Sequence, residues 1–295
     1  MVLSSSLLSE LHLLRQQFIK ERTLWIPSTE MVRICRGLGA STYDMKAART
    51  VSDSLRTDPT LPFRRSKNGR FALNFESRHV SRLEPQPFIL SAAEDFVRYD
   101  SGKVREFEDV DAPLQYNSVL HALFRFKAFM INGVDINHRP GLDYTSASSV
   151  CTLFHLRTVT DAREGLLGQP ALEGVHSDGV DFTMTTLLGH QNMRGDSAET
   201  FLHTLQERNA IAWHETDPAF LLGKVQHMDF LDTLLICDHE RKHSLSPVYS
   251  VDESKEALRD MLIFFTRKPV VEGHVSYPYD SFKEHQRLPL MVEML

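Results

Sequence analysis

A histidine and an aspartate two positions apart, His176 and Asp178, are the side chains best suited to hold a metal in this chain. A third candidate, His243, follows far downstream, just before a proline turn. Two imidazoles and one carboxylate can hold Fe(II) on one face and leave the other open for a cosubstrate and oxygen. Residues i and i+2 of an extended segment face the same side, so His176 and Asp178 can meet one metal. Arg259 then opens an apolar run and could bind the free carboxylate of a 2-oxo acid, since a guanidinium pairs bidentately with a carboxylate.

The chain contains a second His-x-Asp motif, His227-Met228-Asp229, so the motif alone does not select the metal site. The downstream spacing favours the first pair, because His243 follows the second pair by only 14 residues (243 − 229). The other histidine after the second pair, His274, lies 45 residues on (274 − 229), and no arginine that opens an apolar run follows it. For the anion site, Arg267 at the far end of the same run is the alternative to Arg259.

The composition indicates an ordinary globular protein, with 42% hydrophobic and 24% charged residues. A formal net charge of −6 argues against a nucleic-acid partner, which usually meets a basic surface. The three cysteines are widely spaced and form no CxxC pair, which indicates a cytoplasmic location without a disulfide framework. No apolar run approaches the roughly 18 residues of a membrane span, so no membrane partner is expected.

The N-terminal residues have leucines at helical spacing and lack a positively charged leader, which favours an amphipathic helix over a signal peptide. Such a helix would permit a homodimer. The first helix is predicted to cover 6–20. A second is predicted to begin near residue 27, and a further helix is predicted over 114–131. Residues 56–70, rich in proline and charge, are predicted as a break that carries a solvated basic loop at Arg64, Arg65 and Lys67.

From about residue 149 the pattern becomes β-like. Strand-length apolar or alternating runs occupy 149–158, 180–188, 230–237 and 258–266. Short strands without regular helices between them are typical of an antiparallel barrel or jelly roll. We therefore expect an α+β fold in one domain, 1–295. Residues 1–148 would be a mainly helical support, 149–270 a jelly-roll (double-stranded β-helix) core, and 271–295 a C-terminal extension.

Four segments together resemble the 2-oxoglutarate/Fe(II)-dependent dioxygenases. They are Glu173-Gly174-Val175-His176-Ser177-Asp178-Gly179, Arg194-Gly195-Asp196-Ser197, His243-Ser244-Leu245-Ser246-Pro247-Val248 and Arg259-Asp260-Met261-Leu262-Ile263. The resemblance covers roughly residues 150–267. It is strongest to the free L-amino-acid hydroxylases, the group that contains L-isoleucine 4-hydroxylase. The chain departs from that group at Ser177, where glutamine is common, and at 195–198, where Gly-Gly-Glu-Ser is common.

The resemblance implies that His176, Asp178 and His243 bind iron and that Arg259 binds 2-oxoglutarate. It implies Fe(II), 2-oxoglutarate and O₂ as cofactor and cosubstrates, with stimulation by ascorbate. The implied reaction hydroxylates an aliphatic carbon of a free L-amino acid or close derivative while 2-oxoglutarate becomes succinate. The intact Asp178 favours hydroxylation over halogenation, which needs a small residue there to leave room for chloride.

A free amino acid substrate also needs charged partners of its own. Candidates are Arg157 or Arg194 for the carboxylate and Glu173 or Asp181 for the ammonium group. Two alternatives stay open: an oxygenase that acts on a peptidyl substrate, and a non-catalytic metal-binding or interaction β-barrel. Other classes lack support, because the chain has no His-x-His start of a cupin, no GxSxG elbow, no P-loop and no GxGxxG.

Overall fold

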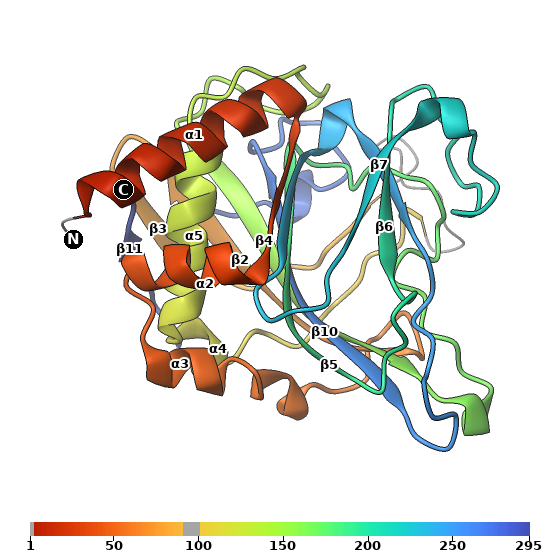
Figure 1. The fold of residues 1–295 in the computed structure, drawn as a ribbon. Coiled ribbons are helices and arrows are strands. Elements are labelled where there is room, and N and C mark those ends of the chain that lie inside the picture. The colour runs from red at the N-terminus through yellow and green to blue at the C-terminus, as the bar shows by residue number, and fades with distance from the viewer. Residues whose placement is uncertain (1–2, 91–100) are drawn as a thin grey trace.

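The computed structural model describes residues 3–90 and 101–295, which form two antiparallel sheets with helices on one side (Figure 1). The larger sheet has the strand order β1-β8-β5-β10-β4-β2-β3-β11, and the smaller sheet has the order β7-β6-β9. This is the α+β jelly-roll arrangement predicted from the sequence. The strands are β1 Thr23–Ile26, β2 Arg64–Asn74, β3 His79–Leu83, β4 Ser148–Thr160, β5 Phe182–Gln191, β6 Glu199–His203, β7 Leu221–Gln226, β8 Thr233–Cys237, β9 Lys242–Leu245, β10 Ala257–Arg267 and β11 Met291–Glu293.

Polar side chains cap the starts of α1 and α5. Ser4 accepts a hydrogen bond from the backbone of Leu7 at the start of α1, and Asn117 accepts one from Val119 at the start of α5. The cap at Asn117 explains why the predicted helix over 114–131 is divided in two. The helices are α1 Ser5–Glu21, α2 Ser28–Gly37, α3 Thr42–Ala47, α4 Ala112–Gln115 and α5 Ser118–Ile131, with 3-10 turns at Val51–Ser54, Ala162–Glu164, Pro218–Phe220, Asp238–Glu240 and Tyr277–Tyr279.

Alternation along β10 divides the larger sheet into a helical side and a cavity side. Leu262 and Phe264 pack in the main hydrophobic core, which also contains the apolar face of α5. Met261, Ile263 and Phe265 line a cavity on the opposite face, as the period of two in a strand requires. The neighbouring strands divide in the same way, with Leu153, Met184 and Leu235 in the core and Phe154, Leu156, Thr183, Thr185, Leu234 and Ile236 at the cavity.

The basic stretch at Arg64, Arg65 and Lys67 is part of β2, so the predicted solvated loop is wrong at these positions. β2 pairs with β4 along its whole length. Lys67 is only 6% exposed, and its Nζ lies 2.8 Å from Oδ2 of Asp111. The strand tolerates this charge because a carboxylate from a distant part of the chain neutralises it.

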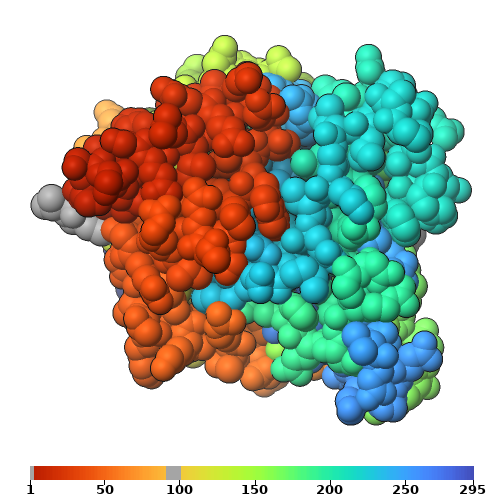
Figure 2. All heavy atoms as spheres, in the orientation of Figure 1, coloured from red at the N-terminus to blue at the C-terminus, as the bar shows by residue number. Residues whose placement is uncertain are grey.

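No structural boundary lies at residue 148, because β2 and β3 belong to the same sheet as β4, β5 and β10. The N-terminal half is therefore more than a helical support. The C-terminal extension also joins the sheet, through β11 paired with β3. Figure 2 shows the N-terminal residues directly against the cyan segment that follows residue 200, where β1 pairs with β8.

The three cysteines, Cys35, Cys151 and Cys237, are free and buried, so none of them forms a disulfide. Over residues 3–90 and 101–295, no helix is both long and apolar enough to cross a membrane.

Candidate active site

The segment 173–178 is held against β9 by paired backbone hydrogen bonds. The amide of His176 donates to the carbonyl of His243 at 3.0 Å, and the amide of His243 returns a bond of 3.0 Å. On the other side, Val175 donates to the carbonyl of Ile211 at 2.9 Å. Gly174, at φ +77°, makes the turn into this segment, and a Cβ there would lie 2.3 Å from that same carbonyl oxygen. Only glycine fits both the conformation and the space.

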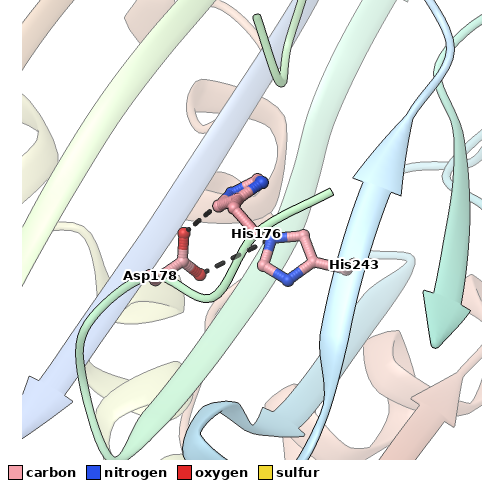
Figure 3. A group of neighbouring side chains, drawn as sticks. All are labelled: His176, Asp178 and His243. Atoms are coloured by element: carbon pink, nitrogen blue, oxygen red, sulfur yellow. Dashed lines mark ion pairs between the residues drawn. The ribbon is translucent and has the colours of Figure 1, made fainter. Parts of the chain in front are cut away.

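The three side chains predicted as metal ligands lie together and are buried (Figure 3). Oδ1 of Asp178 is 3.3 Å from Nε2 of His176, and Oδ2 is 3.7 Å from Nε2 of His243. One ligand atom from each residue lies within 4.8 Å of the others. Two imidazole nitrogens and a carboxylate, grouped on one side of a cavity, fit Fe(II) with open coordination positions.

Neighbouring groups fix the orientation of these ligands. Nδ1 of His176 donates to the carbonyl of Gly174 at 2.8 Å, which leaves the lone pair of Nε2 for a metal. The hydroxyl of Thr183 donates to Oδ2 of Asp178 at 2.7 Å. The amide of Asp178 donates to Oδ1 of the buried Asp238 at 2.8 Å. The site is therefore ordered by residues that are not themselves ligands.

The electrostatics of the site favour a cation. Burial opposes a charge on His176, but the carboxylates of Glu173 and Asp178 outweigh burial and raise the pKa of His176 to about 10. Burial lowers the pKa of His243 to about 4. Burial opposes ionisation of Asp178, yet the two histidines keep its pKa low. Two carboxylates thus converge on one position that stabilises positive charge, as a divalent metal ion requires.

The cavity next to these residues has a volume of about 110 Å³, whereas one water needs roughly 10–15 Å³ by the same measure. Its walls are largely apolar, and Phe88, Phe107, Phe154 and Phe265 form a contiguous aromatic cluster there. Charged residues enter the walls at separate places, namely Arg64, Arg105, Glu173, Asp178 and Arg259. An apolar cavity with a few convergent charges is typical of a site for a small polar molecule.

Arg259 lies in the cavity wall and is 4% exposed. Among residues 3–90 and 101–295 its guanidinium has no ion-pair partner and its Nε no hydrogen-bond partner. Burial lowers the pKa of Arg259 to about 10, so the group still carries a charge at neutral pH. A buried cation in this state calls for an anionic ligand. Its rival Arg267 instead pairs with Asp280, with Nη2 and Oδ1 3.0 Å apart.

Three of the four residues predicted to contact the substrate lie elsewhere. Arg157 makes a bidentate ion pair with Asp260, with bonds of 2.6 and 2.7 Å. Asp181 accepts hydrogen bonds from Tyr144 and from the amide of Lys268. Arg194 is exposed and pairs with its neighbour Asp196. None of the three is in the cavity wall, and their charges already have partners.

Glu173 is the fourth of these residues, and it does line the cavity. Its Oε1 lies 3.3 Å from Nε2 of His176, and its side chain is 9% exposed. The other oxygen, Oε2, is buried and has no hydrogen-bond partner in the described parts of the chain. A buried carboxylate oxygen without a donor fits a site for an amine.

The N-terminal half contributes cavity residues that were not predicted from the sequence. Arg64 comes from β2, and Arg105, Phe88 and Phe107 come from the segments that follow β3. No local pattern marks them as cavity residues. Arg64 is positioned by the pairing of β2 with β4, and Phe88 is bridged to Arg105. His227 of the second His-x-Asp motif also lines this cavity, a position that the motif did not predict.

Comparison with known proteins agrees with this geometry. A model of the 2OG-Fe dioxygenase family matches residues 49–265, most of the chain. The chain belongs to the 2OG-Fe dioxygenase family, whose members use Fe(II), 2-oxoglutarate and O₂. The match begins well before residue 149, in keeping with the role of β2 in the sheet.

Two relatives are similar over nearly the whole chain. The bifunctional enzyme flvA of Aspergillus flavus is 44% identical over 280 residues, which are 95% of this chain and 34% of flvA. The chain thus spans about a third of the length of the curated relative that it matches. The structure of the selenomethionine-labelled Fe(II)/(alpha)ketoglutarate-dependent dioxygenase TqaL has a TM-score of 0.84 and 46% identity, covering 98% of this chain and 96% of TqaL.

A more distant structure shares the fold alone. IDO from Bacillus thuringiensis is 15% identical with a TM-score of 0.64, covering 88% of this chain and 99% of IDO.

Proposed function

We propose that this dioxygenase hydroxylates an aliphatic carbon of a free L-amino acid or a close derivative. The observation that carries the proposal is the charge distribution of the cavity. A carboxylate, Glu173, adjoins the metal ligands, and guanidinium groups lie in other parts of the wall. A zwitterionic amino acid binds best where the protein offers both a negative and a positive group. The aromatic cluster adds an apolar wall for the side chain of the substrate.

Arg259 is assigned to the distal carboxylate of 2-oxoglutarate. The support is its burial, its lack of a partner among the described residues and its place in the same cavity as the metal ligands. A guanidinium presents donors in a fixed fork that matches a carboxylate. Arg267 is not assigned this role, because it already forms an ion pair with Asp280.

Glu173 is assigned to the ammonium group of the substrate. Its unpartnered Oε2 accepts from the amine, and the position beside His176 places the amine close to the metal. The substrate carboxylate is assigned to the arginines of the N-terminal half, Arg64 and Arg105, in place of Arg157 and Arg194. Substrate orientation then follows from opposite charges on different walls.

Each residue has a limited role in the reaction. Bound Fe(II) with 2-oxoglutarate and O₂ supplies an oxidant for an unactivated C–H bond, while 2-oxoglutarate loses CO₂ and becomes succinate. His176, Asp178 and His243 hold the iron, and Arg259 fixes the cosubstrate. Glu173 and the N-terminal arginines orient the amino acid. Apolar residues such as Phe265 and Ile263 exclude water from the reacting carbon.

The test is a panel of the standard amino acids, citrulline and ornithine with Fe(II), ascorbate and 2-oxoglutarate, read by succinate release and by the mass gain of one oxygen atom. Matched N-acetylated amino acids and short peptides complete the panel. We expect turnover with a free amino acid and none after His176→Ala or Asp178→Ala. Turnover of peptides alone would favour a peptidyl substrate, and no coupled turnover would contradict the proposal.

A second measurement tests the assignment of Glu173. In Glu173→Gln, the KM for the amino acid should rise about tenfold or more, because a charge-assisted hydrogen bond is lost. The matched control is Glu164→Gln, an exposed carboxylate outside the cavity, which should leave KM unchanged. An unchanged KM in Glu173→Gln would remove Glu173 from the substrate site.

A further inference from the structure

The second His-x-Asp motif places its histidine in the wall of the cavity, close enough to Arg259 to feel its charge. His227 is 1% exposed and lines the cavity. Asp229 is not among the residues that line this cavity, and the backbone amides of Met228 and Asp229 donate to Oδ2 of Asp232. No metal-ligand cluster forms around His227 in the described ranges. This buried imidazole has no role in the reaction proposed above.

Two contacts fix the ring of His227. Nε2 lies 3.1 Å from the hydroxyl of Thr185, another cavity residue. The indole of Trp25 meets the ring edge to face, with centroids 4.9 Å apart and an interplanar angle of 86°. Thr185 can donate its hydroxyl proton to Nε2, which places the ring proton on Nδ1. Nδ1 is buried and has no hydrogen-bond partner in the described parts of the chain.

The charge state of the ring agrees with this arrangement. Burial lowers the pKa of His227, and the charge of the adjacent Arg259 lowers it further, to about 3. The imidazole is therefore neutral at physiological pH. When Thr185 donates to Nε2, the pair offers one full charge, on Arg259, and one neutral N–H donor, on Nδ1 of His227. A buried donor without an acceptor is costly. A carboxylate at Arg259 would supply that acceptor with its second oxygen.

We propose that His227, oriented by Thr185 and Trp25, is a second contact for the distal carboxylate of the cosubstrate and selects a 2-oxo dicarboxylic acid over a 2-oxo monocarboxylic acid. The inference rests on the assignment of Arg259 to that carboxylate. It gives the second motif a function at the opposite end of the cosubstrate from the metal. Arg259 provides the positive charge, and His227 donates a hydrogen bond that orients the carboxylate.

Three substitutions separate this role from simple packing. His227→Asn retains an N–H near the position of Nδ1, His227→Gln places its amide near the position of Nε2, and His227→Phe keeps the ring without any donor. The protein is loaded with Mn(II) in place of Fe(II), and 2-oxoglutarate binding is measured by calorimetry. Trp25 provides a second readout in a Trp213→Phe background, because the chain has only 2 tryptophans. Thermal unfolding checks that each variant is folded.

We expect the Kd for 2-oxoglutarate to rise about tenfold or more in His227→Phe and His227→Gln, the loss expected for a hydrogen bond to a charged group. His227→Asn should recover most of the affinity. The Kd for 2-oxobutyrate, which lacks the distal carboxylate, should be the same in the wild type and in all three variants. Equal weakening of both 2-oxo acids would mean a packing role and would overturn the proposal.

Arg259→Met separates the role of Arg259 from that of His227. If Arg259→Met weakens 2-oxoglutarate binding and the folded His227 variants do not, the inference about His227 fails alone. If Arg259→Met leaves the Kd unchanged, the assignment of Arg259 fails, and the inference about His227 fails with it.

Discussion

The hydroxyl of Thr183 donates to Oδ2 of Asp178 at 2.7 Å, so a residue of β5 fixes the one carboxylate of the metal site. Oδ1 of the same carboxylate remains directed toward His176. Outer partners of this kind orient a ligand and raise metal affinity, typically by tenfold to a hundredfold. The position of β5 in the larger sheet therefore affects the geometry of the metal site.

Thr183→Val should therefore weaken metal binding by about tenfold to a hundredfold while the fold is retained. The change keeps the shape of the side chain and removes its hydroxyl. Calorimetric titration of the metal-free protein with Mn(II) measures the effect. Thr186→Val is the control, since Thr186 is equally buried but bonds to Thr233. Equal affinity in both variants would show that Asp178 needs no such support.

The two arginines of β10 should respond differently to loss of charge. Arg259→Met should raise the KM for 2-oxoglutarate about tenfold or more, because a buried charge-assisted pair is lost. Arg267→Met should leave that KM unchanged and lower the free energy of unfolding, because Asp280 is left buried without this partner. Steady-state kinetics and denaturant unfolding of both variants test the pair. The reverse pattern would assign the cosubstrate to Arg267.

Two glycines with positive φ provide a matched test of the turn before the metal ligands. Gly165→Ala meets no atom within 4 Å, so the variant should lose only about 1–2 kcal/mol from its left-handed conformation. Gly174→Ala carries the same conformational cost and also drives a Cβ into the carbonyl of Ile211. We expect Gly174→Ala alone to lose metal affinity, because the segment with His176 must shift. Normal Mn(II) binding in Gly174→Ala would contradict this.

The buried Lys127 predicts a pH dependence of stability. Its Nζ donates to the carbonyls of Phe264 at 2.5 Å and Phe182 at 3.3 Å, and burial lowers its pKa to about 8. The unfolded lysine has a pKa near 10.4, so between these values the unfolded chain binds more protons than the folded one. The free energy of unfolding contributed by this group should therefore rise with pH from about 8 to about 10.

Denaturant unfolding at about pH 7.5 and about pH 9.5 checks that prediction. Lys127→Met should reduce the rise in the free energy of unfolding between these two pH values relative to the wild type. Lys46→Met, which removes an exposed lysine, should leave the rise intact. The same rise in Lys127→Met as in the wild type would mean that other groups cause it.

Strands with regular apolar patterns were predictable from the sequence, and β2 was not. The runs that became β4, β5, β8 and β10 have apolar residues facing the helices, which an alternating pattern records. β2 is rich in charge, and its burial depends on partners far away in the chain, such as Asp111 for Lys67. Local hydrophobicity contains no information about such pairs.

The candidate site was likewise predictable only in part. His176, Asp178 and His243 could be chosen by their order along the chain, and they lie together. Arg157 and Asp181 were candidates from the sequence but lie outside the cavity wall. The sequence of a charged residue does not show whether a ligand or a protein neighbour neutralises it, as Asp260 does for Arg157. Arg64 and Arg105 carried no signal, since their part in the cavity depends on tertiary pairing.

The antiparallel pairing of β2 with β4 determines how small an active version of this protein can be. A fragment of residues 149–270 would retain all three candidate metal ligands, yet it would expose one side of β4 as a long unpaired edge, prone to aggregation. It would also lose the wall that contains Arg64, Phe88 and Phe107. The catalytic unit is therefore interleaved along the chain, and shortening the chain from its N-terminus would remove the substrate enclosure before the metal site.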